Sequence, residues 1–175
     1  LPEQEIGHIY ISGPSLMSGY FQDLASQRDI KSTGWMDTGD LGYLLNGHLY
    51  VTGRIKDLII IRGRNIWPQD IEYIAEQEPE IHSGDAIAFV TSQEQIILQI
   101  QCRVGSEQRR AQIVHSLTAR IQSEFGVSAD IELLPTHSIP RTSSGKPARA
   151  EAKKRYLTAF ANTLSPQMQM ADCAQ

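Results

Sequence analysis

The sequence predicts an α+β fold, in which a mostly β segment precedes a compact domain of small antiparallel sheets flanked by helices. Three observations support this prediction. Strand-like runs and turn residues dominate residues 1–54. After residue 58 the pattern becomes hairpin, helix, two strands, helix, strand and helix. The chain is 41% hydrophobic, which is enough to bury a core in a domain of this kind.

The first part of the chain begins with a predicted strand. Residues 6–12 alternate apolar residues with small or polar ones, and a Gly-Pro pair ends the run. We expect a bend at residues 18–21. Asp23 is a suitable N-cap for a short helix that continues to Ile30.

A β-hairpin is predicted around Asn46-Gly47, because this pair favours the type I′ turn that joins two antiparallel strands. Its strands would be residues 43–45 and 48–52. Residues 35–43 are expected to be a loop that leads into the hairpin.

A short charged joint, residues 55–57, separates this part from the next. The apolar run that follows, residues 58–61, is rich in isoleucine and predicts a buried strand. Gly63 and Asn65 are residue types that accept positive φ, so a hairpin turn is expected there.

Helices are predicted after this hairpin. Pro68 suits a first helical turn, and Ile71, Ile74 and Ala75 would form the buried face of that helix. Ser106 is expected to cap a second, longer helix that ends at Gly126. The apolar face predicted for this second helix consists of Val114, Leu117, Ile121 and Phe125.

Three more strands are predicted at residues 85–91, 95–104 and 131–134, and the first two are expected to form a hairpin. A loop rich in Pro, Ser, Thr and Gly follows, and Lys146 is expected to open the last helix. The predicted boundaries are 1–54 for the β segment, 55–57 for the joint, 58–162 for the second domain and 163–175 for a loose tail.

Composition excludes several classes of protein. The formal net charge of −4 argues against a generic nucleic-acid binder. Cys102 and Cys173 have no metal-ligand spacing and no partner pattern, so we expect a reducing, cytoplasmic compartment without disulfides. No apolar run approaches the length of a membrane span. The chain lacks an initiator methionine and a secretion signal at its start, so we expect it to be a fragment of a longer protein.

Thr38-Gly39-Asp40 is the first candidate for a binding site. An acidic residue in a short loop can accept hydrogen bonds from two neighbouring sugar hydroxyls, as dinucleotide-binding folds do with ribose. An ordinary turn is the alternative, and for this short motif alone it is the more frequent case.

Arg54-Ile55-Lys56-Asp57 is the second candidate. Arg54 would contact a nucleotide, and Lys56 would be a pivot that absorbs a large change in φ and ψ. The alternative is a solvated linker, in which charged residues are common.

The run from Arg141 to Lys146 is the third candidate. Its small residues allow backbone N–H groups to approach an anion, and Lys146 adds a mobile positive charge. It is not a Walker loop, because Pro147 stands where that motif has Ser or Thr. A flexible surface loop with a solvated lysine is the alternative.

The three motifs occur in an order and spacing that resemble the adenylate-forming superfamily. This superfamily includes acyl-CoA synthetases, peptide-synthetase adenylation domains and luciferases. The resemblance extends from Ile6 to about Phe160. The matching runs are 9–14, 18–20, 35–40, 53–57 and 140–146. It implies that the chain contains the last β segment of a large N-terminal domain and a complete C-terminal lid domain.

The resemblance also implies a role for each candidate residue. Asp40, in the motif that begins with Thr38, would bind the ribose hydroxyls of ATP with help from Arg54. Lys56 lies where the family has its hinge residue. Lys146 lies at the family's catalytic lysine, which bridges the substrate carboxylate and the α-phosphate. Magnesium is expected with ATP, although no residue of this chain is an evident metal ligand.

Within the superfamily, residues 57–72 most resemble the fatty acyl-AMP ligases, chiefly through the turn Arg62-Gly63-Arg64-Asn65. This implies that a fatty acid is activated with ATP to an acyl adenylate and pyrophosphate. The acyl group would then pass to the phosphopantetheine thiol of an acyl carrier protein. We expect this chain alone to be inactive, because the phosphate loop, adenine pocket and acyl tunnel belong to the N-terminal domain.

Three other interpretations remain open. The first is a long-chain fatty acyl-CoA synthetase, and the second is a carrier-protein docking module without chemistry of its own. A nucleic-acid binder is a distant third. A solvated helix face is predicted to consist of the basic residues Arg149, Lys153, Lys154 and Arg155. Its positive charge would also suit the binding of an acidic carrier protein. The five histidines are predicted to be surface or structural residues.

Overall fold

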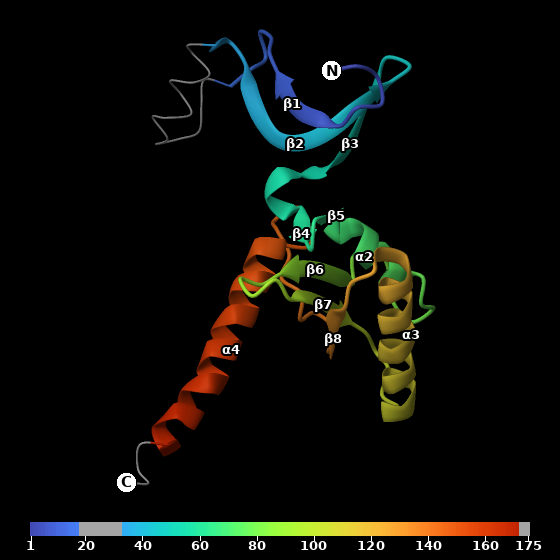
Figure 1. Ribbon diagram of the computed structural model, residues 1–175, viewed down its shortest axis with the longest axis vertical. Coiled ribbons are helices and arrows are strands. Elements are labelled where there is room, and N and C mark those ends of the chain that lie inside the picture. The colour runs from blue at the N-terminus through green and yellow to red at the C-terminus, as the bar shows by residue number, and fades with distance from the viewer. Residues whose placement is uncertain (18–32, 172–175) are drawn as a thin grey trace. The chain divides into compact units, whose positions relative to one another are not determined.

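The computed structural model describes residues 1–17 and 33–171, with side chains described as far as residue 161 (Figure 1). The chain divides into two compact units, Leu1–Leu58 and Ile59–Gln175. The bend expected at residues 18–21 and the helix expected from Asp23 to Ile30 lie outside the described residues.

The first unit contains a three-stranded antiparallel sheet in the order β1–β2–β3. Its strands are β1 (Gly7–Ile11), β2 (Met36–Leu45) and β3 (His48–Arg54). Asn46 and Gly47 have φ values of 52° and 75°, which confirms the predicted two-residue turn. β2 already begins at Met36, so the loop expected over residues 35–43 is wrong. β2 continues through the turn-like residues Thr38, Gly39 and Asp40, which form a bulge in the strand.

A single turn of 3₁₀ helix, η1 (Ile55–Asp57), follows β3. The next hairpin belongs to the second unit and consists of β4 (Ile59–Ile61) and β5 (Arg64–Ile66). Its turn is Arg62-Gly63, with φ values of 50° and 75°. Asn65 lies in β5 opposite Ile60, so its expected place in the turn is wrong. A two-residue turn needs left-handed φ at both central positions, so Arg62 adopts it.

The main sheet of the second unit is formed by β6 (Ala86–Val90), β7 (Ile96–Gln101) and β8 (Ala129–Leu134), in that order. β6 and β7 form the expected antiparallel hairpin. β8 pairs with β7 in parallel, so this sheet is mixed rather than antiparallel throughout. The reason is the connection: a chain that returns through a long helix can enter the sheet in the same direction again.

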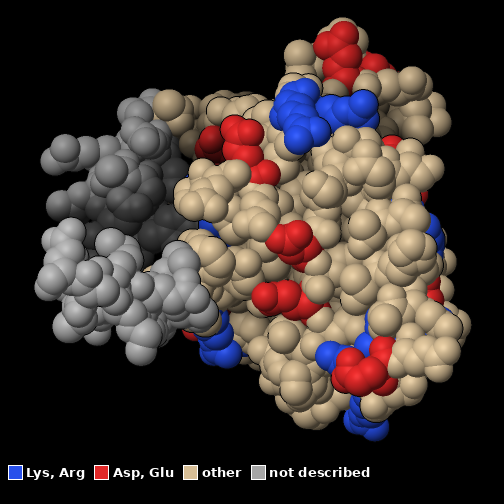
Figure 2. Space-filling model, turned by 60° about the horizontal axis from the view of Figure 1, so that its bottom comes forward, with Lys and Arg blue, Asp and Glu red and all other residues tan. Residues whose placement is uncertain are grey.

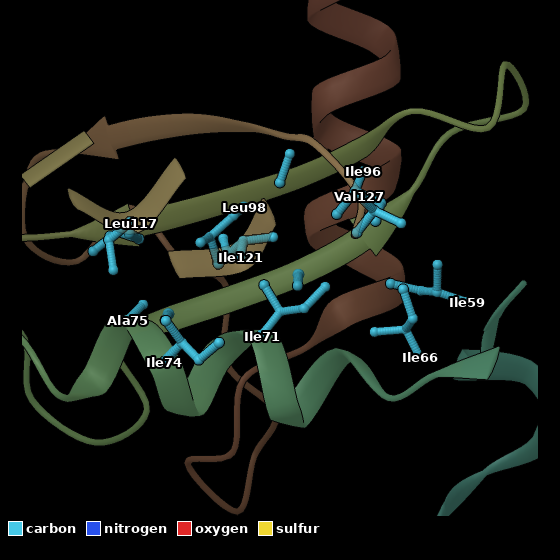
Figure 3. Packing of buried hydrophobic residues seen from close by; sticks show 14 of the residues in the cluster. Ile59, Ile66, Ile71, Ile74, Ala75, Ile96, Leu98, Leu117, Ile121 and Val127 are labelled. Atoms are coloured by element: carbon cyan, nitrogen blue, oxygen red, sulfur yellow. The ribbon is translucent and has the colours of Figure 1, made fainter. Parts of the chain in front are cut away.

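Two helices cover one face of this sheet, α2 (Pro68–Glu76) and α3 (Glu107–Phe125). Figure 3 shows Ile71, Ile74 and Ala75 of α2 directed toward the strands, and all three are buried as predicted. The buried residues of α3 are Ile113, Leu117 and Ile121, whereas Val114 is only half-buried. The residues that complete this core include Ile59, Ile66, Ala86, Ala88, Ile96, Leu98, Ile100 and Val127.

The ends of α3 follow the sequence signals. The side chain of Ser106 accepts a hydrogen bond from the backbone N–H of Arg109, and Gly126 has a left-handed φ of 66°. Both the predicted N-cap and the predicted stop are therefore confirmed.

The opposite face of the sheet packs against α4 (Arg149–Ala171), where Ala152 is buried among Ile87, Phe89, Ile97 and Ile139. Successive side chains of β6 and β7 point alternately toward α2 and α3 on one face and toward α4 on the other, because side chains alternate between the two faces of a strand. α4 begins at Arg149 instead of Lys146, because a residue that precedes proline is disfavoured in the helical region. The helix continues to Ala171, through residues 163–171, where a loose tail was expected.

No helix within residues 1–17 and 33–171 is long and apolar enough to cross a membrane. On the face shown in Figure 2, outside the grey residues, Lys and Arg side chains lie near Asp and Glu and form no continuous basic field.

Candidate functional site

Thr38, Gly39 and Asp40 form a bulge in β2. The pairing with β1 shifts between His8 and Tyr10, so the three residues lie opposite a single residue, Ile9. The hydroxyl of Thr38 donates to the carbonyl oxygen of Ile9 at 2.9 Å and accepts from the N–H of Asp40 at 3.1 Å. Gly39 takes a φ of 71°, a conformation that side chains with a Cβ rarely adopt. The bulge therefore fixes Asp40 in a bent strand instead of a flexible loop.

A second irregularity lies beside Asp40 on the other neighbouring strand. The register between β2 and β3 shifts between Leu41 and Gly42, and the hydroxyl of Thr52 donates to the carbonyl oxygen of Leu41 at 3.1 Å. Arg54, the last residue of β3, lies directly opposite Asp40. Its Nε is 3.2 Å from Asp40 Oδ1.

The Asp40–Arg54 pair can bind a diol. The Asp40 side chain is 29% exposed and that of Arg54 is 70% exposed, so ligands can reach both. An ionised carboxylate accepts hydrogen bonds through two oxygens, and the ion pair joins Arg54 Nε to Oδ1. Because each carboxylate oxygen has more than one lone pair, Asp40 keeps acceptor capacity for neighbouring hydroxyl groups. Thr38 and Asp40 of the first candidate motif and Arg54 of the second are thus close together.

Lys56 lies in η1 and is exposed. Arg54, the residue before η1, is extended, and the backbone N–H of Leu58, the residue after η1, donates to the carbonyl oxygen of Ile55 at 3.3 Å. The chain therefore changes backbone conformation twice within a few residues, immediately before the division between the two units.

Lys146 lies in a tight loop of the second unit. Arg141 and Pro147 form an antiparallel bridge at its base. The backbone N–H of Thr142 donates to the carbonyl oxygen of Lys146 at 2.8 Å, and the Thr142 hydroxyl accepts from the Lys146 N–H at 3.2 Å. Gly145 turns the chain with a φ of 82°. The backbone of Lys146 is therefore held, while its side chain is exposed.

Arg141 attaches this loop to the rest of the second unit. Its guanidinium donates to the carbonyl oxygens of Gly145 at 3.0 Å and Gly84 at 2.8 Å, and it contacts Asp85 at 3.2 Å. The loop is thus joined by hydrogen bonds to Gly84 and Asp85. It also differs from a phosphate loop at a helix start, because α4 begins only at Arg149.

Sequence reasoning missed two residues beside this loop. Arg149 was assigned to a solvated helix face, but its side chain is 19% exposed and forms a 2.7 Å ion pair with Glu72. Glu72, on α2, is 14% exposed. No local pattern could have revealed this pair, because its members are separated by 77 positions in the chain.

Across residues 1–17 and 33–171, no group of three or more His, Cys, Asp or Glu side chains is arranged to hold a metal ion.

Comparisons with known proteins connect these features to one class. No protein-family model matches the chain. A protein of Caulobacter vibrioides (strain NA1000 / CB15N), provisionally named an acyl-CoA synthetase, is 42% identical over 162 residues, which are 90% of this chain and 28% of that protein. The medium-chain-fatty-acid–[acyl-carrier-protein] ligase JamA of Moorena producens is 35% identical over 171 residues, or 89% of this chain and 29% of that protein.

The fold has similar solved relatives. A structure from a study of fatty acyl-adenylate ligases from E. coli and L. pneumophila has a TM-score of 0.87 and 78% identity, covering 93% of this chain and 29% of that one. Other matches include a long-chain-fatty-acid–AMP ligase and a complex with phenylalanyl-adenylate. This chain therefore spans only 28% to 29% of the length of the relatives described above.

The motifs, the fold and these relatives agree: the chain belongs to the adenylate-forming superfamily, as the sequence resemblance indicated. Within that superfamily it matches the C-terminal part of a fatty acyl-AMP ligase.

Proposed function

We propose that this chain works as the C-terminal part of a fatty acyl-AMP ligase. The whole enzyme would activate a fatty acid with ATP and magnesium, forming an acyl adenylate and pyrophosphate in the cytoplasm. Support comes from relatives named as fatty acid–AMP ligases and from the 78% identity to a chain in a study of fatty acyl-adenylate ligases. Residues 1–54 would be the end of the N-terminal domain, and residues 58–162 the C-terminal lid domain.

Asp40 and Arg54 would bind the ribose of ATP in this enzyme. The pair suits two neighbouring hydroxyls, because the carboxylate is fixed by the β2 bulge and remains accessible. Thr38 supports it by holding the bulge to Ile9. Lys56 would be the hinge residue, since η1 lies just before the division between the two units.

Lys146 would act on the chemical step. Attack of the fatty acid carboxylate on the α-phosphorus gathers negative charge around both groups, and a fixed cation stabilises that charge most strongly in the transition state. The observation that carries this proposal is the arrangement at Lys146, where a hydrogen-bonded backbone presents an exposed ammonium group. Lys146 should therefore affect turnover more than ATP binding.

The acceptor of the acyl group would be the phosphopantetheine thiol of an acyl carrier protein. JamA, whose name includes the carrier protein as acceptor, supports this assignment. The alternative is coenzyme A, which the provisional name of the Caulobacter vibrioides relative favours. A carrier-protein docking module without chemistry is a further alternative, and it predicts that Lys146 is dispensable.

The test uses the full-length ligase that contains this chain, as wild type and as Lys146→Ala. Each protein is incubated with a fatty acid and ATP-Mg, and coenzyme A or a phosphopantetheinylated carrier protein is added separately. Products are identified by mass spectrometry. Lys154→Ala is the matched control, because Lys154 is also an exposed lysine but lies on α4 outside the loop.

We expect acyl-AMP from the wild type and the control, transfer to the carrier protein only, and a loss of adenylation of about 10²- to 10³-fold in Lys146→Ala. Efficient formation of acyl-CoA would instead identify an acyl-CoA synthetase. Normal adenylation by Lys146→Ala would contradict the proposed role of this lysine.

A further inference from the structure

The loop that carries Lys146 is closed by its own hydrogen bonds, so something else must fix its position in the domain. Two arginines do this from either side. Arg141 precedes Lys146, Arg149 follows it, and both side chains reach β6 or the residues just before it. Lys146 therefore lies on a short segment whose two flanking arginines bind β6 and the residue Gly84 shortly before it.

The attachment at Arg149 is the more protected of the two. Its Nε donates to the carbonyl oxygen of Ala88 at 2.9 Å, and its Nη2 donates to Glu72 Oε1 at 2.7 Å. The same Glu72 oxygen accepts the backbone N–H of Ala88 at 2.8 Å. The ion pair thus satisfies both the N–H and the carbonyl group of Ala88. Ala88 lies on β6, which is an edge strand because β7 is its only neighbour in the sheet β6–β7–β8.

This arrangement joins three elements at one point. Glu72 comes from α2, Ala88 from β6, and Arg149 is the first residue of α4. The side chains of Glu72 and Arg149 are 14% and 19% exposed, so water screens their charges only weakly. Removing one partner leaves a poorly hydrated charge and one backbone group of Ala88 without its hydrogen bond.

Arg141 holds the other side of the loop that carries Lys146. Its guanidinium joins the carbonyl oxygen of Gly145, at the tip of the loop, to that of Gly84, just before β6. Gly84 has a φ of 80°, a left-handed conformation that favours glycine.

We propose that Arg149, together with Glu72, is a positioning residue for Lys146, and that Arg141 is its counterpart on the other side of the loop. This inference rests on the proposed role of Lys146 in adenylation. Neither arginine needs to touch the substrate. They hold the lysine where its charge meets the developing charge of the transition state, and a displacement of about 1 Å costs roughly 10²-fold in rate.

The alternative is that the Glu72–Arg149 pair only stabilises the fold. The two readings differ in the reaction steps that they affect. A positioning role concerns acyl-AMP formation alone, because Lys146 acts in that step. A purely structural role lowers every activity of the enzyme in parallel with the folded fraction.

The experiment compares wild type, Arg149→Met, Glu72→Gln and Arg141→Met in the full-length ligase. Adenylation is followed by pyrophosphate release, and thiol transfer is followed separately from preformed acyl-AMP to a carrier protein. Circular dichroism gives the folded fraction of each variant. Arg155→Met is the matched control, because Arg155 also pairs with a glutamate on α4 but is 61% exposed.

We expect Arg149→Met to lower the kcat of adenylation by about 10- to 100-fold, with the KM for ATP and the rate of thiol transfer near wild type. Glu72→Gln should lower it less, since the amide oxygen still accepts from Ala88. Arg155→Met should leave the kcat of adenylation unchanged. Because Arg149→Met can fail to fold, Arg141→Met tests the same prediction independently, at the exposed side of the loop.

Normal adenylation by folded Arg149→Met and Arg141→Met would overturn the inference. So would equal losses in both reaction steps. Lys146→Ala, measured in parallel, separates this result from a failure of the proposed function. If Lys146→Ala is inactive while the arginine variants are normal, only the positioning role is wrong. If Lys146→Ala is normal, both proposals fall.

Discussion

Arg64 Nη1 donates a 2.7 Å hydrogen bond to the carbonyl oxygen of Phe125, the last residue of α3. The contact joins the β4–β5 hairpin to the end of a helix that begins about 40 residues later in the chain. A cation at this end is favourable, because the last carbonyl groups of a helix carry partial negative charge. A Cβ added to the neighbouring residue, Gly126, would lie only 2.9 Å from Arg64 Nη1.

Gly126→Ala should destabilise the protein. Its φ of 66° is left-handed, and the new methyl group would also displace the Arg64 guanidinium. We expect the free energy of unfolding to fall by about 1–2 kcal/mol, the cost of a left-handed residue with a Cβ. Urea denaturation measures this loss. The same substitution in an Arg64→Ala background should cost less, and equal costs in both backgrounds would show that only φ matters.

Leu117→Ala should destabilise the second unit much more than Val114→Ala. Leu117 is fully buried in the core, whereas Val114 is half-buried. A large-to-small substitution in a packed core costs about 2–5 kcal/mol, because it removes contacts and leaves a cavity. Thermal unfolding of the two variants compares them directly. Equal losses would mean that α3 is rotated relative to the buried face described above.

These helix residues also show how far the sequence determines the fold. Turn and cap signals are local, so Asn46-Gly47, Ser106 and Gly126 were placed correctly. The buried face of α3 was placed only in part, because Ile113 and Val114 are adjacent apolar residues and the choice between them depends on the sheet beneath. The parallel pairing of β8 likewise depends on a partner strand that is distant in sequence.

The candidate site shows the same limit. Motif order placed Thr38, Asp40 and Arg54 in one binding cluster, and they are indeed neighbours. The surroundings of Lys146 were not predictable. Arg149 resembles a solvated helix residue in the sequence, and its burial arises only when α4 packs on the sheet beside Glu72.

The Glu80–Arg109 pair should make stability depend on pH. Arg109 donates to Glu80 from Nε at 2.8 Å and from Nη2 at 2.9 Å. These hydrogen bonds hold the pKa of Glu80 below its ordinary value of 4.5. A carboxyl group with a lowered pKa stabilises the fold above its unfolded-state pKa, and this stabilisation is lost as pH falls through the folded-state pKa.

Arg109→Met should therefore lower the free energy of unfolding at pH 7, and its difference from wild type should shrink as pH falls below about 4.5. Urea denaturation over a pH series measures the difference. Glu80→Gln is the control, because it removes the titrating group and should flatten the same part of the profile. A difference that is independent of pH would show that Arg109 acts through packing alone.

Asp40→Asn should weaken ATP binding in the full-length ligase. The amide cannot accept hydrogen bonds at both terminal positions, and it loses the charge that pairs with Arg54. Hydrogen bonds to charged groups contribute about 1.5–3 kcal/mol, so we expect the KM for ATP to rise by roughly 10- to 100-fold. Asp37→Asn is the matched control, since Asp37 lies next to the bulge and an amide oxygen can still accept from the Gly39 N–H.

The substrate supplies a second test of the same contact. If Asp40 accepts from the ribose hydroxyls, wild type should use 2′-deoxy-ATP less well than ATP, and Asp40→Asn should lose most of that preference. A general distortion of β2 would raise both KM values and leave their ratio unchanged. The ratio therefore reports the hydrogen bond itself. If Asp40→Asn fully retains the preference for ATP over 2′-deoxy-ATP, another residue binds the 2′-hydroxyl. The Asp40–Arg54 pair would then serve to hold β2 and β3 together.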